Sequence, residues 1–121
     1  MYAVKKILVA FTVLLVSFSS ITSASAHTEI DHTSPSAGAT VEAGVQSISV
    51  EFSDKILDLA NSSEIVVTDS NGDAVELSCV EVNKTSLKVE VFLANEGDYR
   101  VVWRTVAEDG HPISGKFSFK A

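Results

Sequence analysis

Alternation of apolar and polar residues is the feature that most limits how residues 27–121 can fold. Side chains in a strand point alternately to two faces, so alternation predicts strands with one buried face. No stretch of this part of the chain shows a convincing helical period. The expected strands, one of them a short β-branched run at 64–68, are 46–52, 64–68, 74–82, 86–92, 99–106 and 116–120.

Turn-forming residues separate these stretches. Asn71-Gly72 is a strong hairpin signal, and Asn83-Lys84-Thr85 divides the next pair. With an opening strand at 28–33, the chain has about seven short strands, which predicts an all-β, immunoglobulin-like Greek-key sandwich or barrel. Gly97-Asp98-Tyr99 resembles the tyrosine corner of such sandwiches. Residues 54–63 are expected to form a loop or one helical turn.

Residues 1–26 have the layout of a secretory signal peptide. Lys5 and Lys6 precede a largely apolar stretch at 7–18, and Ala24-Ser25-Ala26 has the A-x-A form of a cleavage site. The apolar stretch is shorter than the ~20 residues that a spanning helix needs. We therefore expect export by the general secretory pathway to the periplasm, cleavage after Ala26, and one mature domain, 27–121, that does not span the membrane.

Charge and cysteine content narrow the function. Cleavage would remove two of the nine Lys and Arg residues and none of the 16 acids, which leaves seven against 16 and a formal charge of −9. Such a charge argues against a nucleic-acid partner. Cys79 is the single cysteine, so no internal disulfide is expected, and its place in an alternating run predicts a buried side chain.

The histidines suggest a metal site. If His27 becomes the first residue, its α-amine and imidazole Nδ1 can chelate one ion together. Neighbouring first and last strands would bring Asp109 and His111 to that amine. Three nitrogens and one carboxylate oxygen suit tetragonal Cu(II) or Ni(II), while zinc would take the same donors tetrahedrally. Asp109-Gly110 is also an ordinary turn pair, so spacing alone leaves the site open.

Several motifs occur together along residues 27–121. They are His27 and Ile30, Ser34-Pro35-Ser36-Ala37-Gly38, Val50-Glu51-Phe52-Ser53, Tyr99 to Arg104 (YRVVWR), Asp109 to Gly115 (DGHPISG) and Phe117-Ser118-Phe119. In combination they resemble the bacterial copper-resistance CopC family. The resemblance implies a Greek-key β-sandwich and one Cu(II) ion held by His27, through amine and imidazole, with Asp109 and His111.

The resemblance also implies a role. We expect a monomeric periplasmic protein, not an enzyme, that sequesters Cu(II), transfers it or confers resistance, with an inner-membrane transporter of the CopD type as its partner. Some family members carry a Met-rich Cu(I) site. Met1 is the only methionine here and lies in the predicted signal, so no such site is expected. His32 matches no ligand position and is expected to be a surface residue.

Two other functions compete with this one. An N-terminal histidine also serves copper oxygenases that use a histidine brace, although the mature chain has few aromatic residues for a substrate platform. A metal-free sandwich module for adhesion or assembly is the remaining alternative.

Overall fold

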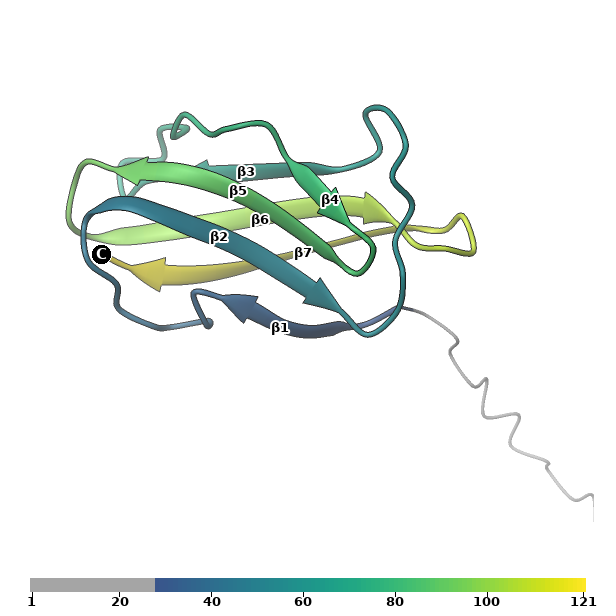
Figure 1. Ribbon diagram of the computed structural model, residues 1–121. Coiled ribbons are helices and arrows are strands. Elements are labelled where there is room, and N and C mark those ends of the chain that lie inside the picture. Colours follow the sequence, from purple (N-terminus) through teal and green to yellow (C-terminus); the bar gives the residue numbers. More distant parts are fainter. Residues whose placement is uncertain (1–27) are drawn as a thin grey trace, which may run out of the picture.

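The computed structural model describes residues 28–121, which fold into seven strands (Figure 1). The predicted signal peptide and His27 lie outside the described residues. No helix in the described residues has the length and apolar character needed to cross a membrane. The strands are β1 (Ile30–Ser34), β2 (Gly44–Phe52), β3 (Glu64–Thr68), β4 (Glu81–Asn83), β5 (Ser86–Leu93), β6 (Asp98–Val106) and β7 (Pro112–Lys120).

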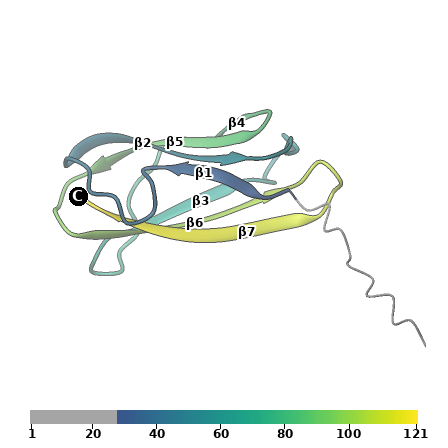
Figure 2. The same ribbon diagram turned by 90° about the horizontal axis from the view of Figure 1, so that it is seen from below.

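The strands form two antiparallel sheets packed face to face. One has the order β1-β2-β5-β4 and the other the order β3-β6-β7. Figure 2 shows the two layers from below, with β2, β5 and β4 in one and β3, β6 and β7 in the other. With strands lettered in chain order, this is the ABED and CFG arrangement of a constant-type immunoglobulin sandwich. The predicted fold class is confirmed.

Alternation along the strands builds the core. Leu87, Val89, Val91 and Leu93 of β5 are buried, while the residues between them are more exposed. They face the inward residues of β6 across the sandwich, whose sheets pack about 10 Å apart. The other buried apolar residues are Ile48, Val50, Phe52, Ile56, Ile65, Val67, Tyr99, Val101, Trp103, Ala107, Phe117 and Phe119.

The tyrosine corner is present. The Tyr99 hydroxyl donates a hydrogen bond to the carbonyl oxygen of Asn95, four residues upstream. The ring is buried and stacks on Phe119 with 5.6 Å between centroids. This contact fixes the entry to β6, the strand that leads to the candidate site.

The strand predicted at 74–82 is wrong over most of its length. Val75 donates its N–H to the carbonyl of Val67 on β3, and three residues later Ser78 donates to Glu90 on β5. The segment therefore crosses from one sheet to the other, and only its end pairs as β4. Cys79 lies in this crossing and is exposed, so the prediction of a buried side chain is also wrong.

Candidate metal centre

The last two strands present the Asp-Gly-His motif at one end of the sandwich. β6 and β7 pair from Asp98 with Lys120 as far as Val106 with Pro112, and residues 107–111 join them. The N–H of Ala107 donates to the His111 carbonyl, and that of Gly110 donates to the Ala107 carbonyl, both at 2.9 Å. Gly110 has φ of +89°, in the left-handed region that glycine enters without strain. The tight loop brings Asp109 and His111 to one side of this turn.

Asp109 and His111 contact each other through both carboxylate oxygens. Oδ1 of Asp109 accepts the backbone N–H of His111, and Oδ2 lies 2.9 Å from Nδ1 of the same residue. In a neutral ring whose proton is on Nδ1, the lone pair is on Nε2, the usual pattern for a metal-binding histidine backed by a carboxylate. The two side chains are 45% and 68% exposed respectively, so the pair is accessible from solvent.

A shallow pocket of about 240 Å³ lies beside this loop, lined by Thr28, Asp54, Glu108 and Asp109. The Asp54 segment is tied to the loop by backbone pairing. Ile56 bridges to Ala107, and Glu108 donates its N–H to the carbonyl of Lys55 at 3.2 Å. Both ribbon views bring the first described residues to the end of the sandwich that carries the β6–β7 loop (Figures 1 and 2). The residue that follows His27 thus borders the same pocket as Asp109.

The structure describes two of the three predicted ligands. Asp109 and His111 are brought together, while His27 lies outside the described residues. Within residues 28–121, no three His, Cys, Asp or Glu side chains form a group able to hold a metal. His32 is exposed on β1, with Nδ1 at 2.9 Å from Asp31 Oδ2, as expected of a surface residue.

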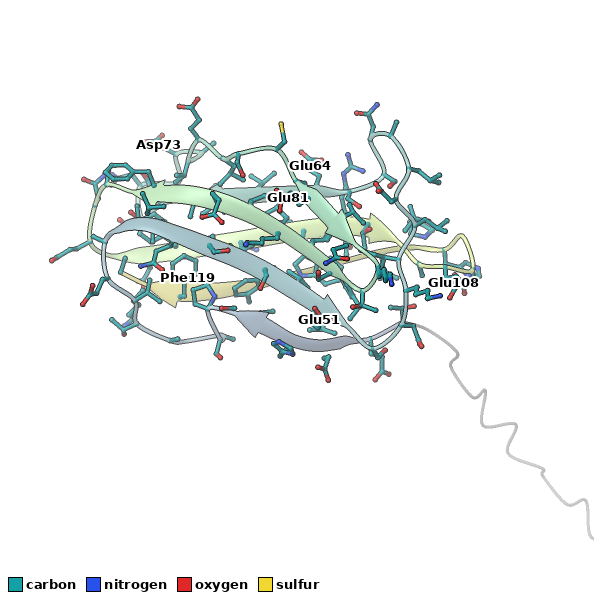
Figure 3. All side chains as sticks on the ribbon, in the orientation of Figure 1. Glu51, Glu64, Asp73, Glu81, Glu108 and Phe119 are labelled. Carbon is teal, nitrogen blue, oxygen red and sulfur yellow. The ribbon has the colours of Figure 1, made fainter. Side chains whose placement is uncertain are left out.

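Two acidic residues of the pocket were missed by the sequence reasoning. Asp54 follows β2, and Glu108 precedes Asp109 in the loop; Figure 3 labels Glu108 at that end of the molecule. Neither residue stands at a spacing in the sequence that suggests a metal ligand. Asp54 is brought to the loop only by the backbone pairing of 55–57 with 106–108. Together with Asp109 they make three of the four residues that line the pocket acidic.

The family model of the CopC domain matches residues 30–121. The chain belongs to the CopC family. The resemblance drawn from the motifs is therefore confirmed for nearly the whole of the described chain.

Two relatives of the chain have names that refer to copper. Copper resistance protein C of Xanthomonas campestris pv. juglandis is 31% identical over 121 residues, covering 92% of this chain and 93% of the relative. Copper transport protein CutJ of Bacillus subtilis is 30% identical over 99 residues, 78% of this chain but 18% of its own length. The crystal structure of CopC from Methylosinus trichosporium OB3b aligns with a TM-score of 0.66 and 26% identity, covering 78% of this chain and 92% of that one.

Proposed function

We propose that this CopC-family chain is an exported protein that binds one Cu(II) ion in the periplasm and sequesters it, transfers it or confers resistance to it. His27 supplies its α-amine and imidazole, and Asp109 and His111 complete the site. The observation that carries the proposal is the pocket shared by Thr28 and Asp109, because Thr28 is bonded directly to His27. The copper-related names of two relatives support the choice of metal.

The donor chemistry favours Cu(II) over softer ions. Imidazole nitrogen, amine nitrogen and carboxylate oxygen suit a tetragonal Cu(II) centre, which also has the highest affinity in the general order of divalent first-row ions. A carboxylate offers about four acceptor positions, so the contacts of Asp109 with His111 are compatible with a metal bond as well. Asp54 lines the same pocket and would add negative charge beside a bound cation.

Export and metal binding are linked in this proposal. Cleavage of residues 1–26 creates the amine that the site needs, because in the precursor the same nitrogen is an amide. The part of copper transport protein CutJ that matches this chain is 18% of that protein, which supports a partner that transports copper. The partner in this proposal is an inner-membrane transporter of the CopD type.

A copper titration of the chain beginning at His27, followed by electron paramagnetic resonance, tests the proposal. We expect one tight equivalent of Cu(II), with nitrogen hyperfine coupling from imidazole and amine. Loss of all copper on dialysis would favour a metal-free module. Copper-dependent oxidation of a polysaccharide by the same sample would favour an oxygenase.

A further inference from the structure

Positive charge is concentrated on one face of this acidic protein. Residues 28–121 contain seven Lys and Arg, and four of them project from the outer surface of the β3-β6-β7 sheet, where every one is exposed. Only two of the 16 acids, Glu64 and Asp98, share that surface, so its formal charge is +2 while the rest of residues 28–121 carries three bases and 14 acids, −11. We call this surface the basic face; its cations are Arg100, Arg104, Lys116 and Lys120.

An apolar hollow lies among these cations. Val66 and Val102 are cross-strand partners, 37% and 43% exposed, and Lys116 pairs with Val102 from the other side. The hollow has a volume of about 190 Å³, room for one apolar side chain, and is lined by Glu64, Val66, Val102, Trp103, Arg104 and Ser114. Burying apolar surface is favourable, so the hollow can accept an apolar side chain of a partner.

Arg104 is already held in place at the edge of the hollow. Its Nε donates to Glu64 Oε2 at 2.6 Å, and its Nη1 donates to the Asn61 carbonyl at 3.4 Å. Figure 3 labels Glu64 on the β3 side of the molecule. An arginine fixed beside an apolar hollow is the pattern of an interface hot spot, because little rotamer entropy remains to be lost on binding.

We propose that the basic face is a docking surface for a protein partner whose acidic surface carries one apolar side chain that enters the Val66–Val102 hollow. Charge complementarity selects the acid, because the basic face carries four cations against two acids. An anionic membrane is a less suitable partner for the basic face, because Glu64 and Asp98 interrupt the positive surface. A lipid layer also presents no side chain that could fill the hollow.

The basic face adjoins the candidate copper loop. Arg104 pairs with Ser114, and from this pair each strand continues for only two more residues before the 107–111 loop. At about 3.4 Å per residue, a partner in the hollow would lie ~10 Å from that loop. A role of this surface in copper transfer rests on the proposed function. The docking of an acidic partner does not depend on it.

An NMR titration of the ¹⁵N-labelled chain 27–121, which contains both sheets and the whole described core, tests the docking surface. The probe is a pentapeptide of four glutamates around a central leucine. Its controls replace the leucine by glycine or the glutamates by lysines. We expect shift changes at Val66, Val102 and Arg104, binding at least ten-fold tighter than either control peptide, and weakening as salt is raised.

Matched charge reversals separate the basic face from charge in general. The double variant Arg100→Glu/Lys116→Glu should weaken the peptide at least ten-fold. Lys84→Glu/Lys88→Glu changes the net charge equally but lies in the β4–β5 turn and on β5 of the other sheet, and should change the affinity less than two-fold. Equal losses of peptide affinity in both double variants, NMR shift changes confined to other surfaces, or no binding of the peptide would overturn the proposal.

Phosphatidylglycerol vesicles test the membrane alternative. NMR shift changes on the basic face with these vesicles but not with the peptide would replace the protein partner with a membrane. Copper titration of the same variants reads out the proposed function separately.

Discussion

At the scale of single residues, His32 and His111 have similar exposure and similar contacts but lie at different places in the fold. Each is exposed, and each has Nδ1 at 2.9 Å from a nearby aspartate oxygen, but only His111 lies in the loop beside the candidate pocket. His111→Ala should remove a nitrogen ligand and lower Cu(II) affinity by about 100-fold or more, roughly 2.7 kcal/mol. His32→Ala should change it less than about three-fold. Isothermal titration with a competing chelator measures both, and equal losses would show that the ligands are assigned wrongly.

Gly115 is a residue whose role is packing. It pairs with Trp103, and a Cβ atom at Gly115 would lie 2.5 Å from Cζ2 and 2.8 Å from Cε2 of the indole. Gly115→Ala should therefore force the ring against Phe52, its edge-on neighbour, and destabilise the fold by about 1–3 kcal/mol. Ser114→Ala, on the exposed side of the same strand, should stay within about 0.5 kcal/mol. Thermal unfolding compares the two, and an unchanged melting temperature for Gly115→Ala would refute the packing argument.

At the scale of elements, the strongest sequence signals gave the right strands. The runs at 46–52, 64–68, 86–92 and 99–106 all lie in observed strands, because the inward face of each is mainly apolar, with Thr105 a buried polar exception. The 74–82 run alternates just as well, yet it divides its backbone bonds between two sheets. Alternation reports which side chains face inward; it carries no information on which strand accepts the backbone bonds.

The candidate site also has a part that could be predicted from the sequence and a part that could not. Asp109 and His111 are two residues apart, so their proximity is local and could be predicted. Asp54 reaches the pocket only through the pairing of Ile56 with Ala107, 51 positions away in the chain. A contact of that kind depends on the packed fold, and the sequence around Asp54 gives no sign of it. The exposure of Cys79 has the same origin, since it follows from the crossing between sheets.

At the scale of the whole molecule, the proposal of Cu(II) rather than Cu(I) depends on the types of ligand that the chain offers. The predicted mature chain has no methionine, and the exposed Cys79 is its only soft donor. Cu(I) should therefore bind weakly, and Cys79→Ser should abolish that binding while leaving Cu(II) affinity unchanged. Competition with a Cu(I)-specific chromophoric chelator measures this. A Cu(I) site as strong as the Cu(II) site that persists in Cys79→Ser would contradict the ligand inventory.

The central claim is that the start of the mature chain and the Asp-Gly-His loop form one copper site. It is tested most directly by comparing two chains that differ by one residue: one beginning at His27 and one with methionine before it. The added residue turns the α-amine of His27 into an amide and breaks the chelate ring, while Asp109 and His111 are unchanged. Cu(II) affinity, measured by chelator competition, should fall at least 100-fold, about 2.7 kcal/mol, with the same melting temperature. Equal Cu(II) affinities in the two chains would contradict the account.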